Sequence, residues 1–381
     1  MRRMLDVAVL GGGVIGCAVA RQLARDGLRV GLFERGRIGG ESSGAAAGML
    51  GVQAEADDPF MLQLGLASRQ RYPEWLAALC EESRMSVEWW REGTLVASFT
   101  AADEAALTAR CAWQAAEGAP SKAVNAAELR VLEPALSRRA RSGALFPLDV
   151  RLDNVALTRA AAAAAVAAGC ALYEGEEVRA VVVERGAAVG VTTASQRVAC
   201  GAVVNAMGAW AARVRGMTPL PVQPVRGQMA VVQAPRALFR HAVYSPQAYA
   251  VARRDGRVLL GSTREAVGFE KRCTAGGIGG ILAAALELAP LLGGVPLIET
   301  WSGLRPGSAD GRPIVSRDPA VRGYFVATGH YRNGVLLAPL TAEVVAQLLQ
   351  GVAGEWQTPL SLERFTPPGG GARVDRLAGA R

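Results

Sequence analysis

Three glycines near the N-terminus constrain the fold of this chain more than any other feature. Gly11, Gly13 and Gly16 stand at the spacing GxGxxG, directly after the short apolar stretch 7–10. In such a turn the first glycine permits a sharp bend, the second lets backbone N–H groups approach a phosphate, and the third lets a helix pack against the strand. The pattern predicts a strand that leads straight into a helix N-terminus, where the helix dipole favours an anion.

The residues that follow complete a βαβ unit. A helix is predicted over residues 14–25, ended by Gly27, and a second strand over residues 29–33. Glu34 stands at the end of that strand, where an acid accepts hydrogen bonds from ribose hydroxyls. Since an acid there would repel a 2′-phosphate, the unit predicts a dinucleotide site that does not take NADP.

Composition narrows the function classes. The chain has 381 residues, half of them hydrophobic, which is enough for one large or two medium globular domains. Its formal charge of +8 comes from arginines scattered along the chain, without the basic and aromatic clusters of a nucleic-acid site. Two histidines and six cysteines without a CxxC pair make a metal site unexpected. Free thiols favour the cytoplasm, and no apolar run reaches the ~18–20 residues of a membrane span.

Motifs of the nucleotide-binding kind occupy the start, the middle and the end of the chain, and a strand-rich remainder lies between them. We therefore expect an α/β protein with two interleaved domains. The nucleotide-binding domain should comprise residues 1–88, 145–218 and 302–366, the second domain residues 89–144 and 219–301, and a flexible tail residues 367–381. Further helices are predicted at 59–82, 102–117, 156–168 and 334–350, and strands at 177–184, 189–193, 198–206, 222–233, 248–263 and 324–328.

A run of small residues at 39–50 favours FAD over NAD as the dinucleotide. Small side chains there let the backbone pass close beneath a flat ring. With this run, the chain resembles the D-amino-acid oxidase superfamily of FAD-dependent oxidoreductases, and within it the glycine oxidases of thiamine biosynthesis. The resemblance extends from residue 5 to about residue 350, in the family's order. The segments that carry it are 9–16, 45–51, 303–307, 310–313 and 329–339.

The resemblance implies a Rossmann-like FAD-binding domain of the GR2 type, with FAD held noncovalently. A second, smaller antiparallel-sheet domain would roof the flavin. By the same resemblance, Arg305 would grip the substrate carboxylate, Tyr249 would lie near the substrate, and Arg332 would sit by the flavin. The implied cofactor-binding residues are Gly11, Gly13, Val14, Ile15, Gly16, Glu34, Arg35, Ser42, Ser43, Ala46, Ala47, Gly48, Met49, Val178, Gly208, Trp210, His330, Arg332, Asn333, Gly334, Val335 and Leu336.

The residue types agree with these roles and leave alternatives open. Arg305 lies in a glycine-rich stretch, and a buried arginine needs an anion, either a substrate carboxylate or a structural Asp or Glu. Tyr249 could equally be a core aromatic with a satisfied hydroxyl. His330 fits a turn-forming role beneath the flavin better than direct chemistry. The helix start at Gly334 would favour an anionic reduced ring through its dipole.

The implied reaction moves a hydride from the α-carbon of glycine or another small amine-carboxylate to FAD. Sarcosine and small D-amino acids belong to the same substrate class. The imine gives an oxo acid and ammonia, or serves thiamine thiazole synthesis, and oxygen is reduced to hydrogen peroxide. A homo-oligomer without a nucleic-acid partner is expected. The alternatives are a dehydrogenase of the same fold that passes electrons to a quinone or protein, and a non-catalytic flavin-binding module.

Three residues depart from the family's pattern. Glu41 stands where a basic residue is usual, Gln247 where a histidine can occur, and Arg264 where a relative has methionine. A charged Arg264 would be costly to bury without a partner. We expect it either to turn outward and pair with Glu265 or Asp255, or to point inward as a second cation in the substrate pocket.

Overall fold

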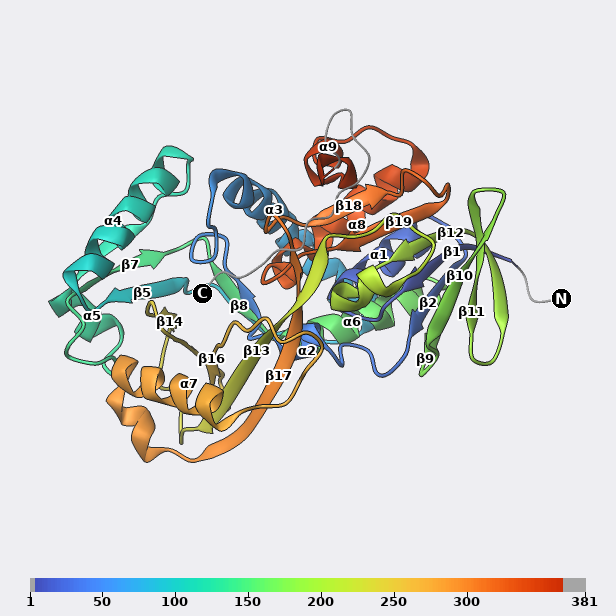
Figure 1. Cartoon of the computed structure of the whole chain (residues 1–381). Coiled ribbons are helices and arrows are strands. Elements are labelled where there is room, and N and C mark those ends of the chain that lie inside the picture. The colour runs from blue at the N-terminus through green and yellow to red at the C-terminus, as the bar shows by residue number, and fades with distance from the viewer. Residues whose placement is uncertain (1–3, 366–381) are drawn as a thin grey trace.

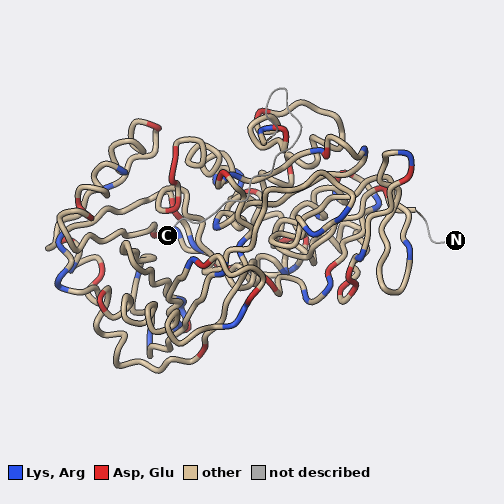
Figure 2. Tube along the Cα trace, viewed as in Figure 1, with Lys and Arg blue, Asp and Glu red and all other residues tan. Residues whose placement is uncertain are grey.

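The computed structural model describes residues 4–365, so the tail expected at 367–381 lies outside the described residues. Two eight-stranded sheets dominate the molecule and lie in different halves of it, as Figure 1 shows. The chain passes between the halves several times, because segments from its start, middle and end build the first sheet. Basic and acidic residues are interspersed along both halves (Figure 2).

The first sheet has a parallel centre in the order β19-β12-β1-β2-β9, and antiparallel strands join it at β12 and β19, whereas β9 forms the opposite edge. Its strands are β1 (Leu5–Leu10), β2 (Val30–Glu34), β9 (Ala171–Glu174), β10 (Val178–Glu184), β11 (Ala187–Thr193), β12 (Arg197–Asn205), β18 (Ile314–Arg317) and β19 (Tyr324–Thr328). Parallel strands need a crossover connection, and helix α1 (Val14–Arg25) supplies the one between β1 and β2.

Four helices pack against one another and share one large core with the first sheet. They are α1, α3 (Pro59–Ser83), α6 (Asn154–Ala167) and α8 (Gly334–Gln350). The alanine-rich sequence of α6 serves this packing, since Ala160, Ala161 and Ala164 are fully buried. Small side chains let the neighbouring helices approach closely, which explains a run that carries no chemistry.

Helix α8 contains a proline whose cost is offset from outside the helix. Pro339 has no N–H to give to the carbonyl of Val335, one turn earlier. The hydroxyl of Tyr72 on α3 donates to that carbonyl instead, and Ser68 Oγ donates to the next one, Leu336 O, at 2.7 Å. Tyr72 is fully buried. The first turn of α8 is therefore held in place by α3.

The second sheet is antiparallel except where β5 runs parallel to β14, in the order β17-β13-β16-β15-β14-β5-β7-β6. Its strands are β5 (Thr94–Ser98), β6 (Lys122–Asn125), β7 (Ser142–Phe146), β13 (Val222–Gln233), β14 (Ala242–Tyr244), β15 (Tyr249–Ala252), β16 (Arg257–Gly261) and β17 (Leu297–Ser308). The sheet reaches past the domain boundaries expected at residues 144 and 301, because β7 continues to Phe146 and β17 to Ser308.

The remaining elements connect or cover the two sheets. A short third sheet consists of β3 (Met49–Leu50), β8 (Val150–Leu152) and β4 (Trp89–Trp90), in that order. Helix α7 (Ala275–Leu288) was not expected, because four of its residues are glycines; it forms because Ile281, Ala285 and Leu288 are buried in the core of the second sheet. The other helices are α2 (Ser42–Ala45), α4 (Ala101–Ala116), α5 (Ala126–Leu132) and α9 (Gln357–Leu360).

The expected elements agree closely with the structure where the sequence pattern is long. The helices predicted at 59–82 and 102–117 appear as α3 and α4, and the hairpin at 177–193 appears as β10 and β11. Within residues 4–365, none of the helices combines the length and the apolar character that crossing a bilayer requires.

The link between Tyr72 and Pro339 gives a prediction for stability. Tyr72→Phe should lower the free energy of unfolding by about 1–3 kcal/mol, because it leaves a buried carbonyl without a donor. Adding Pro339→Ala should recover most of that loss, since the new N–H can serve Val335 O directly. Urea unfolding of the wild type, both single variants and the double variant measures the coupling. A strictly additive cycle would show that the hydroxyl does not compensate for the proline.

Candidate active site

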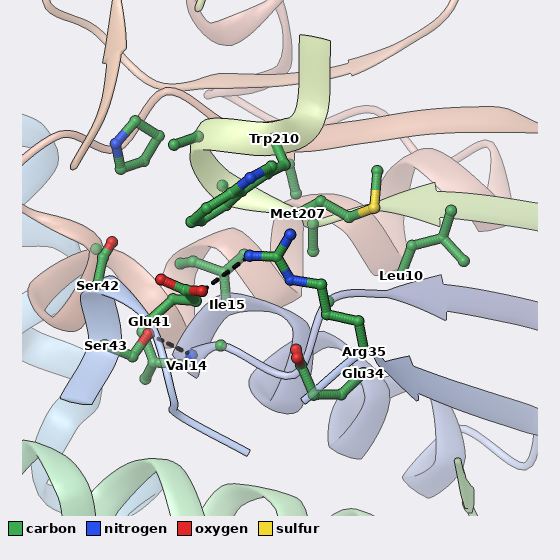
Figure 3. A pocket seen from close by; sticks show the side chains of 18 of the residues that line it. Leu10, Val14, Ile15, Glu34, Arg35, Glu41, Ser42, Ser43, Met207 and Trp210 are labelled. Atoms are coloured by element: carbon green, nitrogen blue, oxygen red, sulfur yellow. Dashed lines mark hydrogen bonds and ion pairs between the residues drawn. The ribbon is translucent and has the colours of Figure 1, made fainter. Parts of the chain in front are cut away.

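A first cavity of about 450 Å³ opens at the carboxyl ends of β1 and β2, where α1 begins. Gly13 is the N-cap of α1 and provides no side chain to cap it. Ser43 Oγ accepts a hydrogen bond from Val14 N at 2.9 Å, which Figure 3 shows as a dashed line. The helix N-terminus therefore faces the cavity with free N–H groups, an arrangement that favours a phosphate.

The glycines of this turn are required by close backbone contacts. Gly11 has φ +104°, and a Cβ there would lie 2.6 Å from Ala206 O. A Cβ on Gly16 would lie 1.9 Å from Gly11 O, so a larger residue would push α1 away from the turn. A Cβ on Gly13 would meet Ser43 Oγ at 3.1 Å. The turn can keep this shape only with glycine at positions 11 and 16, whereas a Cβ at position 13 would crowd only the Ser43 hydroxyl.

Glu34 ends β2 on the cavity wall. One carboxylate oxygen accepts from Gly12 N at 2.7 Å and the other from Gly36 N at 2.8 Å. A carboxylate has about four acceptor positions, so two amide contacts leave capacity for the hydroxyls of a ribose. The same contacts tie the glycine turn to the end of β2.

A chain of charged side chains begins next to Glu34, at Arg35. Glu41 forms ion pairs with Arg35 and Lys271, each at 2.8 Å. The Arg35 guanidinium lies over the ring of Trp210, 4.2 Å from its centre, and Figure 3 shows the two side by side with Glu41. The acid at position 41, unusual for the resembling family, is thus neutralised by two cations from segments far apart in the chain.

The structure places most of the expected cofactor residues around this cavity. Its lining includes Gly11, Gly13, Val14, Ile15, Glu34, Arg35, Ser42, Ser43, Ala46, Val178, Gly208, Trp210, His330, Arg332, Gly334 and Val335. Ala47, Gly48 and Met49 line a second cavity instead. Gly16, Asn333 and Leu336 line neither: Gly16 packs under the turn, and the other two belong to the cap and first turn of α8.

The second cavity, of about 720 Å³, adjoins the first and shares Ser42, Ala46, Tyr331, Arg332 and Val335 with it. One face of the second sheet forms its wall. Strand register places a row of residues across that face, from β13 to β5. The row is Met229, Gly261, Tyr249, Tyr244 and Val96, and all five line the cavity.

Arg305 enters this cavity from β17. Its guanidinium donates to Thr263 O at 3.1 Å and Ser262 Oγ at 2.8 Å, and within residues 4–365 it has no acidic partner. It lies directly over Gly227 on β13, where a Cβ would come within 2.2 Å of Arg305 Nη1. The structural ion pair considered from the sequence is absent from the described part of the chain, so the cation remains available to an anion in the cavity.

Tyr249 lies beside Arg305 on the same wall. Its ring covers Gly261, and its hydroxyl contacts Met229 Sδ at 3.1 Å. Burial raises the pKa of this hydroxyl, and the nearby Arg305 charge partly opposes that rise. Tyr249 therefore remains a protonated hydrogen-bond donor near neutral pH.

Arg332 joins the two cavities. It lies in the connection from β19 to α8, and its Nη2 donates to Asp57 at 3.0 Å. The preceding residue, Tyr331, donates its backbone N–H to Pro306 O at 2.9 Å. That hydrogen bond brings the segment containing Arg332 against the end of β17, one residue past Arg305.

His330 is buried, and its Nε2 lies 2.9 Å from Thr341 Oγ1 of α8. Burial lowers the pKa of its imidazole to about 3, so the ring is neutral at ordinary pH. Backbone pairing with Gly307 fixes the turn from the other side. These contacts agree with the turn-forming role expected for His330.

Two cavity residues were missed in the sequence. Tyr244 stacks on Tyr249 with ring centres 5.1 Å apart, and its hydroxyl donates to Glu55 at 3.1 Å. Both Tyr244 and Glu55 line the second cavity. The hairpin turn before Tyr249 was the available signal for Tyr244, since it places the two tyrosines opposite each other. Glu55 lies in a loop that no local pattern marks.

The prediction that Arg264 forms a surface ion pair with Glu265 or Asp255 is wrong. Glu265 is bound by Arg226 at 2.9 and 3.0 Å, and Asp255 by Arg257 at 2.8 Å. Arg264 itself is exposed, yet it lines the second cavity. Gln247, the other departure near the presumed entrance, also lines this cavity from an exposed position.

The two cavities together fit FAD. The first has a free helix N-terminus for phosphates and Glu34 for a ribose, and the second adjoins it along the small residues 45–48, which leave room for a flat ring. Among residues 4–365, no group of three or more His, Cys, Asp or Glu is arranged to hold a metal ion.

The family model described as FAD dependent oxidoreductase matches residues 6–348. The chain belongs to this family, and its cofactor is FAD.

Comparison with individual proteins gives the same result. Glycine oxidase of Geobacillus kaustophilus is 37% identical over 92% of this chain and 94% of its own length. Its crystal structure superposes with a TM-score of 0.90 over 95% of this chain and 99% of that one. Iminodiacetate oxidase from Chelativorans sp. BNC1, at 27% identity, superposes with a TM-score of 0.85, covering 95% and 99% of the two chains. The bifunctional protein ThiO/ThiG of Trichormus variabilis is 34% identical over 90% of this chain and 52% of its own length.

The first prediction from the site concerns Glu34. Glu34→Ala should weaken FAD binding by about 1–3 kcal/mol, roughly a 10- to 100-fold rise in Kd, because charge-assisted hydrogen bonds are lost. Glu174→Ala is a matched control, since Glu174 pairs with Glu34 on the adjacent strand but lines neither cavity. Fluorescence titration of apoprotein with FAD measures both variants. Equal affinities for the two variants would contradict a role for Glu34 in the dinucleotide site.

The second concerns His330. An unfolded histidine has a pKa of about 6.5, whereas burial holds that of His330 at about 3. The unfolded state therefore binds the extra proton first, so stability is complete above about pH 6.5 and is lost as pH falls toward 3. Between pH 7 and 4.5 the wild type should lose on the order of 2 kcal/mol more than His330→Gln. Urea unfolding of the holoproteins at each pH provides the measurement, and parallel curves would refute the buried neutral ring.

Proposed function

We propose that this protein oxidises glycine or a similarly small amine-carboxylate, with sarcosine and small D-amino acids in the same class. The products are an imine, which gives an oxo acid and ammonia, and hydrogen peroxide. One observation carries the proposal: Arg305 projects into a cavity without an acidic partner in residues 4–365, on the wall that also holds Tyr249. A guanidinium in this setting is suited to the two oxygens of a carboxylate.

Four residues of the second cavity have a role in the proposed reaction. Arg305 binds the substrate carboxylate and fixes the position of the α-carbon. Tyr249 stays protonated and orients the bound molecule, while Glu55, held by Tyr244, offers an acceptor to the amine. No general base is required if the amine binds uncharged, because the bond broken at the α-carbon carries its hydrogen away as hydride.

FAD supplies the hydride acceptor when it is bound, and oxygen takes the electrons from it. The residues proposed to hold it are those of the glycine turn, Glu34, the segment 42–49 and the start of α8. The positive end of the α8 dipole and the charge of Arg332 meet where the two cavities join. Both stabilise negative charge on a reduced cofactor.

The proposed context is the synthesis of the thiazole of thiamine. The relatives support it, because one is a glycine oxidase and another joins a comparable region to ThiG in one bifunctional chain. We further propose that the protein is cytoplasmic and forms a homo-oligomer, and that the two sheets are the cores of a FAD-binding and a substrate domain.

A kinetic prediction tests the role of Arg305. Arg305→Ala should raise KM for glycine about 10- to 100-fold, since each hydrogen bond to a charged group contributes roughly 1.5–3 kcal/mol. FAD should remain bound, because Arg305 lines only the second cavity. Arg305→Lys should recover little, since one ammonium cannot reproduce a bidentate contact. Peroxide release in air and anaerobic bleaching of the flavin measure turnover and reduction separately.

The control for this prediction is Arg254→Ala, which removes a largely exposed arginine in the turn between β15 and β16 that lines neither cavity. Wild-type kinetics in both Arg305 variants would make Arg305 structural. Flavin bleaching without peroxide would instead identify a dehydrogenase.

A further inference from the structure

The second cavity holds three guanidinium groups that no acid in residues 4–365 neutralises. Four arginines line it: Arg110, Arg264, Arg305 and Arg332. Arg332 pairs with Asp57 at 3.0 Å, and Arg110 donates to Ala54 O at 3.0 Å. For Arg110, Arg264 and Arg305, no acidic side chain of the described chain lies within ion-pair distance.

The acids nearest to Arg264 in sequence are engaged elsewhere. Glu265 accepts from Arg226, Gln228 and Thr263, and the Arg226 guanidinium above all holds the pKa of that carboxyl at about 2. Glu265 therefore carries a full charge that is already paired and turned away from the cavity. Glu265 is therefore not available to form an ion pair with Arg264.

The acidic residues that line the cavity also have hydrogen-bond or ion-pair partners. Asp57 belongs to Arg332, and Asp103 caps the first turn of α4 through the backbone N–H groups of Phe99 and Thr100. Glu55 accepts from the Tyr244 hydroxyl. The cavity consequently offers the guanidinium groups of Arg110, Arg264 and Arg305, and Glu55 as an acidic acceptor, to whatever it binds.

Arg264 and Arg305 belong to the same part of the wall. Arg305 donates to Ser262 Oγ at 2.8 Å and to Thr263 O at 3.1 Å, the two residues immediately before Arg264. Consecutive Cα atoms are about 3.8 Å apart. The Cα atom of Arg264 therefore lies next to Thr263, whose carbonyl accepts from the Arg305 guanidinium. Thr263 turns its hydroxyl away toward Gln228 and Glu265, whereas Ser262 and Arg264 both line the cavity.

We propose that this cavity takes an amino or imino acid with a second carboxylate, the first bound by Arg305 and the second by Arg264. This inference rests on the proposed oxidase function and specifies its substrate class. Because Arg264 is exposed, water screens its charge, so we expect a preference of about two- to fivefold and not an absolute requirement.

Isosteric pairs isolate the charge of the second group. D-Aspartate against D-asparagine tests an acid on the α-carbon, and iminodiacetate against its monoamide tests one on the nitrogen. For the wild-type holoenzyme, kcat/KM should favour the acid about two- to fivefold in at least one pair. Arg264→Gln should bring that ratio close to one, Arg264→Lys should keep most of it, and raising the salt concentration should reduce it.

Arg272→Gln is the matched control. It removes the same charge from the same connection, but its side chain is 84% exposed, pairs with Glu270 and lines neither cavity. The acid-to-amide ratio of this variant should equal that of the wild type. If the ratio falls as much in Arg272→Gln as in Arg264→Gln, general attraction by the surface explains it and the proposal is overturned.

A binding measurement separates this proposal from the oxidase function. Succinate and its monoamide, neither of which has an amine to oxidise, are titrated against the holoenzyme by the change in the flavin spectrum. Tighter binding of succinate that disappears in Arg264→Gln supports the two-cation pocket even if no amine is oxidised. Oxidation of glycine with no acid preference in either amine pair, and equal affinities for succinate and its monoamide, would overturn it while leaving the oxidase function intact.

Discussion

The site depends on one backbone contact between the two halves of the molecule. Tyr331 N donates to Pro306 O at 2.9 Å, and His330 pairs with Gly307. Through these bonds the end of β17, which belongs to the second sheet, meets the segment that leads from β19 of the first sheet into α8. Arg305 is thereby brought to the place where the two cavities join, beside Arg332 and the positive end of α8.

Packing around that contact fixes two features of the cavities: the first turn of α8 and the wall that the second sheet forms. The Tyr72 hydroxyl donates a hydrogen bond to the carbonyl that Pro339 leaves without a donor, so the first turn of α8 is held by α3. Gly227 and Gly261 leave room on the second sheet for Arg305 and the ring of Tyr249. The absence of side chains at these two glycines therefore shapes the substrate wall as much as the functional groups do.

Much of the fold could be predicted because its signals are local. The turn at Gly11, the acid Glu34 and the long helices have patterns confined to short segments, and the resemblance extended this to the family. Helix α7 was missed because its glycines oppose a helix and packing on the second sheet overrides them. Glu55 was missed because its place depends on a loop that meets Tyr244 across almost two hundred residues.

The sequence by itself determined the chemistry that the chain can support: a dinucleotide turn, an acid after β2, and an arginine in a glycine-rich strand. These depend on residue type and near spacing, which short-range sterics and hydrogen bonding govern. Only the tertiary structure decided which charges are neutralised. Arg226 was no more marked than Arg264 in the chain, yet long-range packing gives Glu265 to Arg226 and leaves Arg264 at the cavity without an acid in the described residues. Pairing of charges depends on distances in space, and these are set by contacts between segments far apart in sequence.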